Sequence, residues 1–236
     1  MLTLQSLLAA AVVGALAGTY ASIRGMYKDS IYQGFGAGRF AGSVVVGIIV
    51  AIALASALQF ALSESAALIL LFGLTYAAER GIYESWKTFV ATQDQSDLFI
   101  PTITICGVLV AARIVRIASG IVFVIAIGLF LFALAQVDRS ASGPPTPAKS
   151  AFAGLVGGAI VAAGGAWRNA PREGFQRMRF IRSPFMTIAF ALLLSFLTQS
   201  YLYLAVAAIG YERAAVETWK TVCAYVAFRF SNGPWA

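Results

Sequence analysis

Two similar charged segments contain the side chains best suited to chemistry in this chain: ERGIYESWKT, residues 79–88, and ERAAVETWKT, residues 212–221. On a helix the arginine, the second glutamate and the lysine of each segment share one face, where they can neutralise one another. The glutamates are candidates for proton or cation coupling, and the cations are candidates for holding an anion. These residues are Glu79, Arg80, Glu84 and Lys87, and their counterparts Glu212, Arg213, Glu217 and Lys220.

Two basic segments form a second matched set, GMYKDSIYQGFGAGRFAGS at 25–43 and GAWRNAPREGFQRMRFIRS at 165–183. We expect both to be loops in which glycine lets backbone N–H groups and flanking cations approach a phosphate or carboxylate. Alternatively, the basic and aromatic side chains anchor the chain among lipid headgroups. Recurrence in both copies favours a shared structural or ligand-binding role. The matched cations are Lys28 and Arg39 in the first segment, and Arg168 and Arg179 in the second.

The elements that position these side chains are predicted to be membrane-spanning helices. Hydrophobic residues make up 60% of the chain, charged residues only 11%, and the mean hydropathy is +0.82. Apolar runs long enough to cross a bilayer as helices recur along the whole length. The sequence therefore predicts an all-α polytopic membrane protein with about eight spans, at 5–23, 41–62, 65–84, 98–115, 118–137, 150–166, 183–198 and 200–218.

The matched segments also predict an internal duplication. Residues 11–43 and 151–183 agree at nine of 33 positions, and the two charged segments agree at six of ten. Each copy would be a three-helix unit. Two helices between the copies would invert the second one, whereas a single irregular span there would leave the copies parallel. We expect a first repeat at 1–97, a connecting helical hairpin with a Pro-rich linker at 98–149, and a second repeat at 150–236.

Small residues spaced four apart occur at matching places in the two predicted repeats. Gly14 and Gly18 form one such pair, and Gly154 and Gly158 form the other. Within lipid, glycines at this spacing let two helix backbones approach closely. We expect them to pack helices against each other, between repeats or between subunits.

Several functional classes are disfavoured by composition. The chain has no histidine and only two cysteines, outside any ligand spacing, so we expect no metal site and no cofactor. The net charge is +7, but the basic residues are dispersed between apolar runs, which disfavours nucleic-acid binding. Eight spans with both termini in the cytoplasm of a bacterial cell would put the excess of lysine and arginine on the inner side of the cytoplasmic membrane.

These features favour a membrane transport protein, a transporter, channel or lipid translocator, for an anionic or phosphate-bearing substrate. In each repeat the basic segment and the charged segment would share one membrane face, giving a polar site at each surface. An integral membrane enzyme acting on a lipid phosphate is an alternative, disfavoured by the scarcity of clustered acids. A structural subunit of a membrane complex, or a homo-oligomer, is another alternative, because self-paired charges also suit a purely structural role. Membrane lipids are the expected partners in every case.

Overall fold

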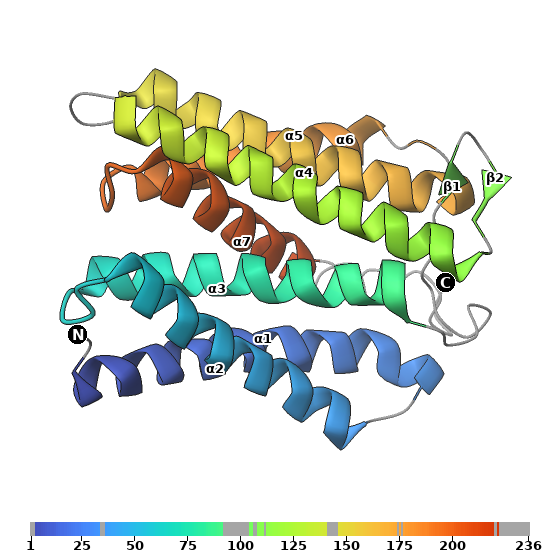
Figure 1. Cartoon of the computed structure of the whole chain (residues 1–236), viewed down its shortest axis with the longest axis horizontal. Coiled ribbons are helices and arrows are strands. Elements are labelled where there is room, and N and C mark those ends of the chain that lie inside the picture. The colour runs from blue at the N-terminus through green and yellow to red at the C-terminus, as the bar shows by residue number, and fades with distance from the viewer. Residues whose placement is uncertain are drawn as a thin grey trace, which may run out of the picture. The chain divides into compact units, whose positions relative to one another are not determined.

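The computed structural model describes residues 3–33, 36–91, 104–105, 108–110, 112–140, 146–173, 175, 177–219 and 221 (Figure 1). Apart from two strands of two residues each, the regular structure in these residues is helical. The all-α fold class is therefore confirmed. The elements are α1 (Leu4–Gln33), α2 (Ala37–Leu58), α3 (Ser65–Ser85), the π-helix η1 (Trp86–Val90), β1 (Thr104–Ile105), β2 (Val108–Leu109), α4 (Arg113–Ser140), α5 (Pro147–Glu173), α6 (Arg177–Leu194) and α7 (Tyr201–Trp219).

Five of the described helical stretches are long and apolar enough to cross a membrane. This is compatible with the predicted membrane location, since each stretch covers the ~30 Å of hydrocarbon in a bilayer. The apolar part of α6, Phe180–Leu194, is shorter. The five stretches are Leu4–Arg24, Ala37–Leu58, Ser65–Val90, Arg113–Ser140 and Pro147–Ala166.

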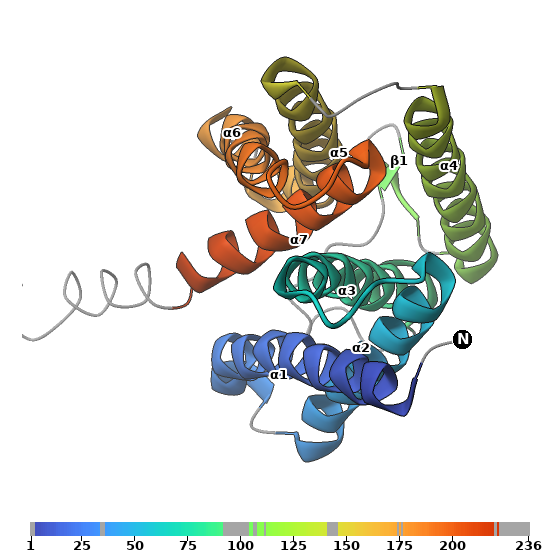
Figure 2. The same ribbon diagram turned by 90° about the vertical axis from the view of Figure 1, so that its left-hand side faces the viewer.

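The chain divides into two compact units, and the division falls within α3 and within α7. The first unit contains residues up to Glu79 together with those from Gly210 onward. Its α1 and α2 pack closely, with α3 alongside them (Figure 2). A Cβ on Gly14 would lie only 2.7 Å from the Cα of Ile48, and one on Gly18 only 2.6 Å from the Cα of Val44. Glycine is thus required for this backbone approach.

The contact between α3 and α7 in the first unit is equally close. A Cβ on Gly210 would lie 2.8 Å from the carbonyl carbon of Gly73, so the two helices cross backbone to backbone. Tyr211 follows Gly210 directly, and its hydroxyl donates a hydrogen bond of 2.8 Å to the carbonyl oxygen of Ile69, one turn before Gly73 on α3. The C-terminal half of α7, which carries Glu212, Arg213 and Glu217, therefore begins in contact with α3.

The second unit contains residues 80–209, and its α5 and α6 pack against each other. A Cβ on Gly154 would lie 2.8 Å from the Cα of Ile188, and one on Gly158 would lie 2.8 Å from the Pro184 nitrogen. Gly154 and Gly158 therefore lie where α5 and α6 approach most closely.

Polar side chains fix two helix ends in the second unit. Asp138 on α4 accepts hydrogen bonds from the Tyr201 amide at 2.6 Å and the Ser200 hydroxyl at 2.6 Å, which caps the N-terminus of α7. Buried Arg116, also on α4, donates from Nη2 to the carbonyl oxygens of Thr88 at 3.2 Å and Ala91 at 2.9 Å. This guanidinium donates hydrogen bonds to carbonyl groups at the C-terminal end of η1, where carbonyl groups lack a partner within the helix.

Two sequence-based predictions are wrong over the described residues. A helix was expected at 98–115, but Thr104–Ile105 pairs antiparallel with Val108–Leu109, and α4 begins only at Arg113. The β-branched run TITI at 102–105, with Pro101 before it and Gly107 after it, explains why an apolar segment here favours strand over helix. One described helix, α4, therefore stands where a helical hairpin was expected.

The two basic segments, expected as loops, are largely helical. Helix α1 continues to Gln33 and so includes Lys28, and α5 continues to Glu173 and so includes Arg168. Tyr, Met, Lys and Gln in one segment, and Ala, Arg and Glu in the other, tolerate helix well enough to extend it beyond the apolar run. Hydropathy marks where a span leaves the hydrocarbon, but it does not mark where the helix ends.

Candidate functional site at the α1, α3 and α7 contact

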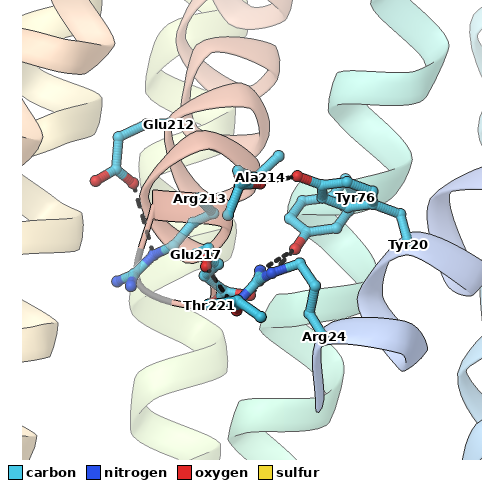
Figure 3. Close-up of polar contacts among 9 residues, drawn as sticks. Tyr20, Arg24, Tyr76, Glu212, Arg213, Ala214, Glu217 and Thr221 are labelled. Carbon is cyan, nitrogen blue, oxygen red and sulfur yellow. Dashed lines mark hydrogen bonds and ion pairs between the residues drawn. The ribbon is translucent and has the colours of Figure 1, made fainter. Parts of the chain in front are cut away.

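Three helices of the first unit bring a compact polar cluster together. Helix α1 contributes Tyr20 and Arg24, α3 contributes Tyr76, and α7 contributes Glu217 and Thr218 (Figure 3). The small residues Ala17, Ala21 and Ala214 pack around the Tyr76 ring in the same buried cluster. Because these residues are small, the helices can approach closely enough for side chains on three of them to meet.

Arg24 and Glu217 form the centre of the cluster. The Arg24 Nη1 donates to Glu217 Oε2 and also lies 3.2 Å from the Tyr76 hydroxyl oxygen. That hydroxyl donates in turn to the same carboxylate oxygen, with an O···O distance of 3.1 Å. Arg24 is 8% exposed, whereas the Glu217 side chain retains 20% exposure. Glu217 is therefore the more exposed side chain of the pair.

Tyr20 braces the cluster from the side of α1. Its hydroxyl donates to the Ala214 carbonyl oxygen at 3.2 Å and hydrogen-bonds with the Thr218 hydroxyl. Its ring stands edge-on to the Tyr76 ring, with centroids 5.7 Å apart, and the Arg24 guanidinium carbon lies 5.9 Å from the Tyr20 centroid. The Tyr20 ring and the Tyr76 hydroxyl thus both contact the guanidinium.

The Arg24 guanidinium has more donors than the described contacts use. Its Nε is buried and has no hydrogen-bond partner within the described part of the chain. A guanidinium carries five N–H donors in a planar fork that suits carboxylate and phosphate. The Arg24 Nε–H is therefore a donor that the described contacts leave unused.

Two further carboxylates of the first unit are fully buried. Glu79 is 1% exposed and Glu212 is 0% exposed. They occupy the same place in the two matched charged segments, directly before an arginine. The Glu212 Oε2 lies 3.7 Å from the Nε of Arg213. Buried acids in an apolar helical chain are costly, so their recurrence at matched positions marks them as functional candidates.

The other predicted residues of the first charged segment lie in the second unit. Arg80 and Lys87 both contact the Tyr83 ring, at 5.1 Å and 4.3 Å from its centroid. Glu84 is half-buried. Since the unit boundary falls between Glu79 and Arg80, the predicted surface site is not brought together within one unit.

The basic residues predicted in the matched segments have varied positions. Arg39 is exposed in the first turn of α2, close to Gly36. Lys28, Arg168 and Arg179 lie in α1, α5 and α6, and their side chains are outside the described part of the structure. Lys220 lies outside the described residues.

Sequence reasoning missed Tyr20, Arg24 and Tyr76. Arg24 had a detectable signal, because it lies four residues after Tyr20 on a helix whose preceding run is apolar. An arginine at that place, one turn from a tyrosine, indicates a polar patch on the packed face. Tyr76 offers no such signal, because an aromatic residue in an apolar run usually belongs to the hydrophobic core.

Over the described residues there is no group of three or more acidic or cysteine side chains arranged to hold a metal ion. No protein-family model, curated protein or solved structure matches the chain.

Proposed function

We propose that this chain is a membrane transport protein for an anionic or phosphate-bearing substrate, with Arg24 as its anion-binding group. The observation that carries the proposal is the 8% exposed Arg24 beside a Glu217 side chain that retains 20% exposure. A charged side chain within a membrane-spanning bundle costs a few kcal/mol, and such residues commonly mark substrate or ion pathways.

The proposal extends to a route for the substrate along α7. Glu212 and Glu217 lie on this helix five residues apart, with Arg213 between them, and all three are at least partly buried. Arg213 is the one cation among these three residues, and it would be the next positive charge for an anion that leaves Arg24. The same chemistry suits a free phosphate or carboxylate and the phosphodiester of a lipid headgroup.

We further propose that α1–α2 and α5–α6 are copies of one ancestral helix pair. The contacts of Gly14 with Gly47, Ile48 and Ala51 correspond, at an offset of 140 residues, to those of Gly154 with Thr187, Ile188 and Ala191. Matched neighbours in both pairs support duplication beyond the sequence identity.

The number of helices between the pairs bears on their orientation. Helix α4 is the one long helix described between α3 and α5. If every helix crosses, four crossings separate equivalent points of the two pairs, which favours parallel copies over inverted ones. Seven crossings would also place the two termini on opposite sides of the membrane, unlike the eight-span expectation.

The Arg24 cluster belongs to one copy only. At the offset of 140, Tyr20 corresponds to Ile160 and Arg24 corresponds to Gly164. The first helix pair would then carry the binding site, and the second pair would have only a structural role. This arrangement differs from the pair of equivalent surface sites that the sequence suggested.

Reconstituted liposomes test the proposal. Influx of radiolabelled phosphate and translocation of a fluorescent phospholipid across the bilayer would be measured in parallel, which separates a solute carrier from a lipid translocator. We expect one of the two activities in the wild type and its loss in Arg24→Gln. Arg139→Gln, which removes an exposed cation on α4, is the matched control and should retain activity. Equal activity in wild type and Arg24→Gln would refute the assignment of Arg24.

A further inference from the structure

We infer that Glu217 couples anion binding to proton uptake: a proton on its carboxylate releases Arg24, which then takes the phosphate or carboxylate group of the substrate. This inference rests on the proposed function and adds its coupling ion. It follows from the fact that one guanidinium nitrogen, Nη1 of Arg24, is held by a single carboxylate oxygen, Oε2 of Glu217.

The first step concerns competition for Arg24. The guanidinium is buried against Tyr20 and Tyr76, so it has little water to solvate it if Glu217 leaves. A buried cation without a counter-ion is strongly unfavourable. Arg24 therefore needs one anionic partner at all times, and that partner is either Glu217 or a bound anion.

The second step concerns the proton. An ionised Glu217 next to a bound anion would place two negative charges around one guanidinium in a poorly hydrated site, which raises the affinity of Glu217 for a proton. Protonation leaves the carboxyl group neutral and Arg24 paired with the anion. The charge of the cluster is then the same before and after binding of one proton and one monoanion.

The surroundings of Glu217 permit this exchange. From α1 it faces Arg24, with the Tyr20 hydroxyl beside Thr218. From α3 it faces the hydroxyl of Tyr76, which can donate to Glu217 or to an anion. On α7, Arg213 lies one turn before it and pairs with Glu212, while the Thr221 hydroxyl donates to the Glu217 carbonyl oxygen at 2.9 Å.

Two lysines lie near this site in sequence. Lys28 is one turn beyond Arg24 on α1, and Lys220 is three residues beyond Glu217. The side chain of Lys28 and the whole of Lys220 lie outside the described part of the structure. The proposed exchange rests on the described contacts of Arg24 and Glu217, and the Glu217 side chain is 20% exposed.

Calorimetric titration of the full-length protein in detergent tests the inference. The probes are dimethyl phosphate and dihexanoyl phosphatidylglycerol, two phosphodiesters that each carry one negative charge. Titration in two buffers with different ionisation enthalpies gives the number of protons taken up. We expect about one proton per bound anion in the wild type, and an affinity that falls about tenfold per pH unit wherever the anion-free protein has Glu217 ionised and paired with Arg24.

Variants separate the inference from the proposed function. Glu217→Gln should bind the probe with no proton uptake and with a pH-independent Kd, while Glu64→Gln, which removes an exposed carboxylate, should behave like the wild type. Anion binding that depends on Arg24 but takes up no proton in the wild type would overturn the inference and leave the proposed function intact. No binding of either probe, or binding unaffected by Arg24→Gln, would overturn both. The proton count in the wild type decides the matter even if Glu217→Gln fails to fold.

Discussion

Arg24 and Glu217 are 193 residues apart in the chain, yet they form an ion pair in the contact between α1 and α7. Tyr76 on α3 bonds to both members of the pair. Three helices are therefore held by one polar cluster in addition to their apolar packing. Substitutions in this pair should affect stability as well as the proposed function, and the two effects need separate measurements.

Removing one member of the pair should cost more stability than removing both. Arg24→Gln removes the charge-assisted bond from the buried guanidinium to the Glu217 carboxylate, which should lower the free energy of unfolding by about 3 kcal/mol. Arg24→Gln with Glu217→Gln leaves two neutral amides that can bond to each other, and should be more stable than Arg24→Gln alone. Denaturant unfolding in detergent, followed by circular dichroism, measures both. Additive losses in the double variant would show that the pair is not coupled.

Substitution of the helix-contact glycines should destabilise both helix pairs alike. Gly14→Ala and Gly154→Ala each place a Cβ within 3 Å of the facing backbone, and overpacking of this kind costs about 1–3 kcal/mol. Gly42→Ala on α2 is the matched control, because a Cβ there has nothing within 4 Å and alanine improves helix propensity by up to about 1 kcal/mol. Thermal unfolding of the three variants gives the comparison. A loss at Gly42 equal to that at Gly14 would contradict the packing assignment.

Arg116 should hold the π-helix η1 in place. Arg116→Gln removes the charge-assisted bonds to the Thr88 and Ala91 carbonyl oxygens and leaves the packing of Phe89 against Phe123 and Gly120 in place. We expect amide hydrogen exchange across Trp86–Ala91 to accelerate at least about tenfold, which corresponds to about 1.4 kcal/mol of local stability. Arg113→Gln, which removes an exposed cation one turn earlier on α4, is the control. Unchanged exchange in Arg116→Gln would show that η1 is held by packing alone.

Cysteine labelling should place the ends of α1 and α5 on one side of the membrane. In a background with Cys106→Ala and Cys223→Ala, single cysteines at Ser30 and Ala170 would be tested with a membrane-impermeant maleimide. Four crossings between these positions, through α2, α3, α4 and α5, predict the same accessibility at both. Accessibility from opposite sides would instead support inverted repeats and an additional crossing between α3 and α5.

Local sequence patterns predicted the helices because a helix that crosses a membrane satisfies its own backbone. The apolar runs alone therefore indicated α1, α2, α3, α4 and α5. They failed at 98–115, where an apolar run rich in β-branched residues has the hydropathy of a span without its helix preference. They also placed the ends of α1 and α5 too early, because hydropathy reports the lipid boundary and the hydrogen-bond ladder continues past it.

What the sequence determined by itself is the chain's all-helical class, its apolar surface and the charged segments that begin at Glu79 and Glu212, since each depends on residues close together along the chain. Only the tertiary structure decided which charges meet. Glu217 pairs with Arg24, which lies outside both charged segments. The physical reason is that small residues at helix crossings set how closely helices approach, and that distance, not sequence spacing, determines which side chains come within hydrogen-bonding reach.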